Sequence, residues 1–219
     1  MEGSMDKYLK PTHAIESDHP SIRRIVEAAA RGAGEESELA RRLFLRARDE
    51  IAYDVESPFF LPVHYRASFV LERERGFCIQ KAVVLAALCR CAGIPARLVF
   101  ADIRNHRAPP ELVEMMGTDV FAHHCYNELW LGGRWVKVVC SFDRELCQRH
   151  DFPLVEFDGR NDALFPAKDA LGRPFIEYVR IHGPSDDVDV AEILGAWERI
   201  YGRERVQAWK QALSARTGS

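Results

Sequence analysis

Hydrophobic and polar residues along the first fifty positions follow the spacing of amphipathic helices. Ser17–Asp18 stands just before Pro20, an arrangement typical of a helix start, and an amphipathic run continues through Ala30. A second run, Glu36 to Ile51, predicts another helix with apolar residues at positions 39, 43, 45, 47 and 51. Residues 57–62 contain two prolines and end this helix.

A strongly apolar run begins at Cys78 and predicts a buried helix. The run ends at Ala92–Gly93, because Gly93 suits a left-handed C-cap and Pro95 forbids further helix. Residues 96–103 then predict a strand.

Two β-prone runs, Tyr126–Leu131 and Arg134–Val139, flank Gly132–Gly133 and predict a hairpin. Residues 151–188 hold several Pro, Gly and Asp residues and predict irregular structure.

The stretch Val190–Ser214 predicts helix interrupted near Gly202, with aromatic residues that we expect to dock on the rest of the protein. Because helices come first and strands follow, the predicted class is α+β. We divide the chain into an N-terminal extension (1–16), a main domain (17–188) and a C-terminal helical extension (189–219).

Composition narrows the classes of partner. Hydrophobic residues make up 47% of the 219 residues, enough for a sizeable core, and the formal net charge is -3. The chain has no general basic field for nucleic acid or anionic lipid, and no apolar stretch approaches the roughly 18 residues of a membrane span. We therefore expect no nucleic-acid or membrane partner, and the oligomeric state stays open.

The six cysteines suggest a compartment. The first twenty residues lack the apolar run of a secretion signal, and a chain of this size can form a full core without disulfides. We therefore expect free thiols and a reducing, cytoplasmic location.

The first turn of the predicted helix is a favourable place for a reactive thiol. Its unpaired N–H groups and the positive end of the helix dipole favour a thiolate, so we expect the pKa of Cys78 to lie below its ordinary value of about 8.5. The same N–H groups can hold the oxyanion of a tetrahedral intermediate. Gly76 is expected to allow a sharp turn and to leave room for a substrate. Position alone also fits an ordinary buried cysteine, so the catalytic hypothesis needs a base.

Among eight histidines, His123 and His124 are best placed to serve as that base. They stand just before the predicted hairpin, where the start of a strand can present an imidazole to a thiol. For each of them, a satisfied core or surface histidine is the ordinary alternative.

Two stretches resemble motifs of the transglutaminase-like superfamily. GFCIQKAVVLAALCRCAGIPAR resembles its nucleophile helix, which carries Gly-x-Cys, an alanine- and leucine-rich helix, and Arg-x-x-Gly-Ile-Pro-Ala-Arg. The second half of that motif matches Arg90, Gly93, Ile94, Pro95, Ala96 and Arg97. HCYNELWLGGRWVKV resembles the family's histidine motif, with matches at Glu128, Gly133, Trp135 and Val136. This register makes His124 the base and turns His123 to the other side of the strand.

The third family motif is where the sequence departs from its relatives. Most members carry an Asp four residues after the Trp, completing a Cys-His-Asp triad, and here that position is Val139. Asp143 follows in VCSFD and can reach His124 only if the chain bends back after Val139. We predict that Asp143 is the displaced acid and that it accepts a hydrogen bond from His124. A Cys-His dyad is the alternative.

The resemblance implies a fold and a chemistry. The fold is the papain-like α+β arrangement of cysteine proteases and transglutaminases, with a nucleophile helix packed on an antiparallel β-sheet, N-terminal helices and a C-terminal helix. The Cys78 thiolate would attack a carboxamide or peptide carbonyl, and His124 would protonate the leaving amine. The thioester would pass to water or to another amine. The implied substrate is a protein, a peptide or a small amide, and no metal or organic cofactor is needed.

Two other classes compete with a cysteine hydrolase or acyltransferase. A transglutaminase-like binding module with a decayed triad fits the altered acid position, since fold does not determine function. A zinc site could draw on Cys89 and Cys91 together with His123-His124-Cys125, but the spacing of that cysteine pair differs from the usual C-x₂₋₄-C unit.

Overall fold

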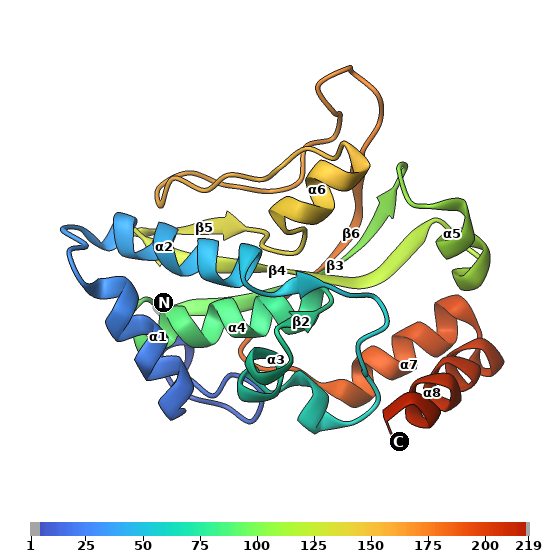
Figure 1. The fold of residues 1–219 in the computed structure, drawn as a ribbon, viewed down its shortest axis with the longest axis horizontal. Helices are drawn as coiled ribbons and strands as arrows, with labels where there is room; N and C mark the ends of the chain where they lie inside the picture. Colours follow the sequence, from blue (N-terminus) through green and yellow to red (C-terminus); the bar gives the residue numbers. More distant parts are fainter. Residues whose placement is uncertain (1–4, 218–219) are drawn as a thin grey trace.

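The computed structural model describes residues 5–217, and its architecture is α+β, as the sequence predicts (Figure 1). The main sheet is antiparallel, with strand order β5-β4-β3-β6, and β1 and β2 form a short parallel pair. The strands are β1 (Ala52–Tyr53), β2 (Arg75–Gly76), β3 (Ala96–Asn105), β4 (Val120–Leu131), β5 (Arg134–Val138) and β6 (Ile176–Ser185).

The helices come mainly before and after the sheet. The long helices predicted from the sequence are confirmed with boundaries shifted by a few residues. The helical elements are η1 (Met5–Tyr8), α1 (Pro20–Ala30), α2 (Glu36–Asp49), η2 (Pro62–Tyr65), α3 (Ala67–Arg73), α4 (Cys78–Cys91), α5 (Pro110–Met116), α6 (Arg144–His150), α7 (Val190–Tyr201) and α8 (Arg203–Thr217).

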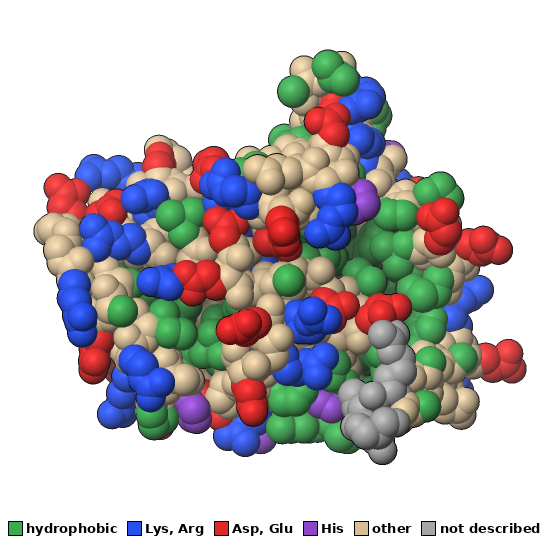
Figure 2. Space-filling view, viewed as in Figure 1, with side chains coloured by type: hydrophobic (Ala, Val, Ile, Leu, Met, Phe, Trp, Pro, Cys, Tyr) green, Lys and Arg blue, Asp and Glu red, His purple; other side chains and the backbone are tan. Residues whose placement is uncertain are grey.

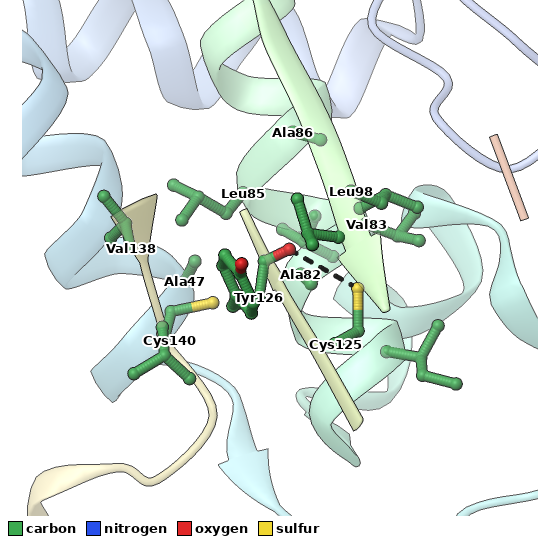
Figure 3. Packing of buried hydrophobic residues seen from close by; sticks show 14 of the residues in the cluster. Ala47, Ala82, Val83, Leu85, Ala86, Leu98, Cys125, Tyr126, Val138 and Cys140 are labelled. Carbon is green, nitrogen blue, oxygen red and sulfur yellow. Dashed lines mark hydrogen bonds between the residues drawn. The ribbon is translucent and has the colours of Figure 1, made fainter. Parts of the chain in front are cut away.

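Helix α4 is the centre of the core. Every side chain from Ile79 to Arg90 is buried, because α4 packs against β3 and β4 and is covered by α1, α2 and α3 (Figure 1). Figure 3 shows the contact at close range, with Ala82, Leu85 and Cys125 packed together between helix and sheet. Full burial of a Val or Leu side chain contributes about 1.5–3 kcal/mol, so this helix supplies much of the stabilisation of the core.

The predicted hairpin is confirmed. Strands β4 and β5 pair from Asn127↔Val138 to Leu131↔Arg134, and Gly132 and Gly133 form the two-residue turn between them. Both glycines have positive φ, 57° and 80°, as a tight turn of this type requires. The ladder ends at Val138, one residue earlier than expected.

Strand β6 contradicts the expectation that residues 151–188 are irregular throughout. It pairs with β3 from Leu98↔Ser185 to Asn105↔Ile176. Because β6 is an edge strand, it tolerates Pro184 and Gly183, the residues that hide its pattern in the sequence. The short helices α3 and α5 also lack a clear sequence signal.

The C-terminal helices dock on the body, as expected. The ring of Trp197 in α7 lies 5.1 Å from that of Phe59 and 6.0 Å from that of Phe77, the residue before α4. The division of the chain at 16/17 and 188/189 stays a prediction. All six cysteines are free thiols, as expected.

Among the helices of residues 5–217, none combines the length and apolar character needed to cross a bilayer.

Gly159 offers a test of how the segment after α6 attaches to α2. Its φ is +80°, and a Cβ there would lie 2.0 Å from the backbone oxygen of Ser37. Gly159→Ala should therefore cost about 1–2 kcal/mol of backbone strain and a further ~1–3 kcal/mol for moving the backbone of α2. Gly172→Ala is the matched control, because its φ is +77° and nothing lies near its Cβ position. Urea unfolding measures both, and equal losses would show that the approach to Ser37 is unimportant.

Candidate functional site

Cys78 is the first residue of α4, as predicted. Phe77 precedes it in an extended conformation and ends the strand-like segment. The side-chain oxygen of Gln80 accepts a hydrogen bond from the Phe77 N–H at 3.1 Å, which satisfies one of the unpaired donors at the helix start. Local sequence therefore fixes where α4 begins, and with it the position of the thiol.

Gly76 has a different role from the one expected. It does not adopt a positive φ, so a sharp turn is not the reason for glycine here. A Cβ at this position would lie 2.9 Å from the side-chain oxygen of Gln80 and 3.3 Å from Val70. Gly76 thus leaves room for the Gln80 side chain, whose amide nitrogen donates to the backbone oxygens of Pro58 and His64.

The thiol of Cys78 faces the backbone N–H of Cys125 on β4, the residue after His124. Burial raises the pKa of Cys78 to about 11, although the backbone N–H groups of Cys125, Ile79 and Cys78 itself oppose the shift. The expected lowering of this pKa is therefore wrong for the structure as it stands. The helix start does favour the thiolate, but removal of the sulfur from water outweighs it.

His124 lies in the interior on β4. Its ring contacts those of Phe165 and Tyr178, with centroids 5.7 Å and 6.3 Å away. Burial lowers the pKa of its imidazole to about 3, and its Nε2 atom has no hydrogen-bond partner among the described residues. The imidazole is therefore neutral at physiological pH and able to accept a proton.

Asp143 is held by backbone amides. It is the N-cap residue of α6, where Oδ1 accepts from the Leu146 N–H at 2.8 Å, and Oδ2 accepts from the Tyr53 N–H at 2.7 Å. Within residues 5–217 it has no hydrogen bond to His124, so the expected contact is absent from this arrangement. The sequence DREL, an Asp before a short amphipathic stretch, carried the signal for an N-cap.

Two tyrosines that the sequence analysis did not single out contact the predicted acid and the predicted base. Burial raises the pKa values of the Tyr53 and Tyr178 phenols. Tyr53 binds Asp143 and Tyr178 contacts His124. Cys78 begins α4, His124 lies on β4 and Asp143 caps α6. Their assignment as catalytic residues stays a prediction.

The position that holds the acid in most relatives is apolar here. Val139 is 1% exposed, and its N–H donates to the backbone oxygen of Ala163 at 2.9 Å. No carboxylate from this position can orient His124, and β5 has already ended one residue earlier.

The group of residues able to hold a metal shares only His123 with the zinc ligands considered in the sequence. Among the described residues, one group of His, Cys, Asp or Glu side chains has its ligand atoms close together, and it consists of Asp102, His123 and His182. Cys89 and Cys91 lie near the end of α4 and do not belong to it.

The model of the transglutaminase-like superfamily matches residues 23–140. This range contains Cys78 and His124 and ends before Asp143. No match was found among the curated proteins.

Three solved structures are similar in outline. A candidate cysteine protease from Cytophaga hutchinsonii is 18% identical with a TM-score of 0.49, and the match covers 86% of this chain and 58% of that one. The periplasmic domain of TgpA from Pseudomonas aeruginosa is 22% identical with a TM-score of 0.42, and the match covers 62% of this chain and 47% of that one. A candidate protease from Parabacteroides distasonis is 16% identical with a TM-score of 0.40, and the match covers 63% of this chain and 25% of that one. The matches thus span at most 58% of the length of these proteins.

The family match covers more than half of the chain, including all of α4 and the β4–β5 hairpin. The chain belongs to the transglutaminase-like superfamily and has its papain-like α+β fold.

Proposed function

We propose that the protein is a cysteine-dependent amide or peptide hydrolase, or an acyltransferase, that works through a thioester on Cys78 with His124 as acid and base. The observation that carries the proposal is the position of the thiol. Cys78 starts a buried helix and faces the backbone N–H of Cys125, directly after His124. Cys78 and His124 both fall within the residues that the family model matches.

The first step begins from neutral groups. Burial keeps Cys78 as a thiol and His124 as a neutral imidazole at pH 7. The sulfur attacks the carbonyl carbon of the substrate while its proton passes to His124, and the carbonyl electron pair moves onto oxygen. The backbone N–H groups of Cys78 and Cys125, which face the sulfur, support placing the developing oxyanion there.

The second step releases the amine. The oxyanion collapses, the C–N bond breaks, and the imidazolium of His124 gives its proton to the leaving nitrogen. Water or a primary amine then attacks the thioester, with His124 again taking the proton, and the thiol of Cys78 is restored. Which acceptor is used depends on how well the site excludes water.

The surface supports a substrate with apolar side chains. Figure 2 shows a hollow with a hydrophobic floor beside the sheet, on the side of the molecule where α5 and α7 lie. A protein, a peptide or a small amide is the proposed substrate. The six free thiols fit a reducing compartment, and we propose the cytoplasm.

A binding module without catalysis is the second candidate. Val139 in the usual acid position and the two backbone partners of Asp143 favour it, because neither residue orients His124 in this arrangement. Catalytic turnover of a substrate would support the enzyme, and binding without turnover would support the binding module.

The direct test uses glutamine-containing peptides, with ammonia release reporting hydrolysis and incorporation of a fluorescent primary amine reporting transfer. We expect Cys78→Ala and His124→Ala each to lower the rate by on the order of 10³-fold or more, since removal of either group stops the same step. Cys91→Ala is the control, a partly buried cysteine at the other end of α4. An unchanged rate in Cys78→Ala would assign the activity to another group.

The pH dependence of Cys78 alkylation tests the protonation state. Because the pKa of Cys78 is raised to about 11, the thiolate fraction should grow about tenfold per pH unit through pH 8 to 10 without a plateau. The rate of iodoacetamide labelling at Cys78, measured by peptide mass spectrometry, gives this profile. A plateau already present at pH 6 would indicate a preformed thiolate–imidazolium pair instead.

Substitution of Asp143 separates a capping role from a positioning role. Asp143→Ala should destabilise the protein by ~1–2 kcal/mol, since the N-cap of α6 is lost, and Asp143→Asn should cost less because Asn also caps helices well. If Asp143 also positions His124, the pH profile of Cys78 alkylation should change in Asp143→Ala and be partly restored in Asp143→Asn. Unchanged profiles in both variants would leave Asp143 as a structural residue.

A further inference from the structure

Three side chains from neighbouring strands of the main sheet converge on one point. Asp102 lies on β3, His123 on β4 and His182 on β6, and β3 is the strand between the other two (Figure 1). The Nε2 atom of His182 lies 2.9 Å from Oδ1 of Asp102, and Nδ1 of His123 lies 3.9 Å from the same oxygen. The ligand atoms of all three lie within 4.8 Å of one another.

Both histidines occupy irregular positions in the sheet. In β4, Ala101 pairs with His124 and Ile103 with Phe121, so Ala122 and His123 together oppose Asp102. In β6, Phe100 pairs with Gly183 and Ala101 with Ile181, which leaves His182 as the extra residue. Bulges of this kind re-aim side chains, and here both turn an imidazole toward one carboxylate.

Helix α7 holds the bulge in β4. The Ala122 N–H donates to the Tyr201 hydroxyl at 2.6 Å, and the Ala122 carbonyl accepts from the Trp197 indole at 3.0 Å. The backbone groups of Ala122 are therefore satisfied by α7. The His123 N–H donates to Asp102 at 3.0 Å, which also fixes the carboxylate.

The buried Nδ1 atom of His123 is unsatisfied among the described residues. The side chain of His123 is 7% exposed. A buried polar atom without a partner costs about 1–3 kcal/mol. The hydrogen bond between His182 and Asp102 does not satisfy this atom, whereas a cation bound by all three side chains would.

The spacing suits a small divalent cation. Zinc binds imidazole nitrogen at about 2.0–2.1 Å and carboxylate oxygen at about 2.0–2.2 Å, which places two tetrahedral ligand atoms about 3.4 Å apart. The distances from Oδ1 of Asp102 to the two imidazole nitrogens, 2.9 Å and 3.9 Å, lie on either side of that value. Side-chain shifts of about 1 Å or less would therefore bring all three ligand atoms to the spacing that zinc requires. The carboxylate of Asp102 would offset one of the two positive charges of the ion. The His182 side chain, 21% exposed, gives access from solvent.

We propose that Asp102, His123 and His182 form a binding site for one Zn²⁺ ion, with a fourth position open to water. The site lies outside the cysteine chemistry proposed above, and a bound ion would fix β4 at the residue before His124. Its existence does not depend on catalysis by Cys78.

The test uses the full chain, stripped with EDTA and dialysed, and titrated with ZnCl₂ by calorimetry. We expect one ion per chain. His182→Ala should weaken binding by more than about 100-fold, since loss of a ligand should exceed the 10–100-fold cost of losing a residue behind a ligand. Asp102→Asn is a second variant that keeps the shape of the side chain. His106→Ala is the matched control, because His106 follows the last residue of β3, lies beside Glu177 of β6 and stands outside the cluster.

Cobalt gives a readout that distinguishes the cluster from the cysteines. Co²⁺ in this nitrogen- and oxygen-containing site should show visible d–d bands without the near-ultraviolet thiolate-to-cobalt band, and His182→Ala should lose them. Less than about a tenth of an ion per chain, binding unchanged in both His182→Ala and Asp102→Asn, or a thiolate band would each overturn the proposal.

Discussion

The burial of α4 between the sheet and the N-terminal helices determines where Cys78 lies. A helix buried on every side can occupy only those positions in which all of its polar groups find hydrogen-bond partners. In α4, two polar residues determine that position. Gln80 donates to the backbone oxygens of Pro58 and His64, and Lys81 donates to those of Arg48 and Ile51 at the end of α2. A shift of α4 by one residue would break these hydrogen bonds, and each buried polar group left without a partner would cost several kcal/mol. The position of the thiol is therefore fixed by contacts made one turn farther along the helix.

The same burial shapes the chemistry of the site. Burial opposes charge, so it holds Cys78 and His124 in their neutral forms. The helix start and the Cys125 N–H stay in place beside the sulfur, where they favour a negative charge. The adjacent His123 has a different environment, because the bulge in β4 separates two side chains that are neighbours in sequence. One stretch of β4 thus serves two distinct clusters of residues.

Motif residues and strong periodicity made much of this structure predictable. The long helices, the hairpin and the position of Cys78 at a helix start follow from local patterns and turn residues, which act over a few positions. Protonation states did not follow, since the pKa values of Cys78 and His124 depend on burial by distant segments. The partners of Asp143 were also hidden, because Tyr53 comes from a two-residue strand with no pattern of its own. Nor did the cluster of Asp102, His123 and His182 show in the sequence, since its members come together only through two bulges and an edge strand.

The contact between α7 and Ala122 has a consequence for synthesis of the chain on the ribosome. The two side chains that satisfy the Ala122 backbone come 75 and 79 positions after it. At about 5–20 residues per second, they emerge roughly 4–16 seconds later. During that interval α4 and the hairpin are already available to pack, but the backbone of β4 beside His124 lacks the partners that hold its bulge. We infer that α4 is positioned early and that the backbone of β4 beside His124 is held in place only after α7 has been made.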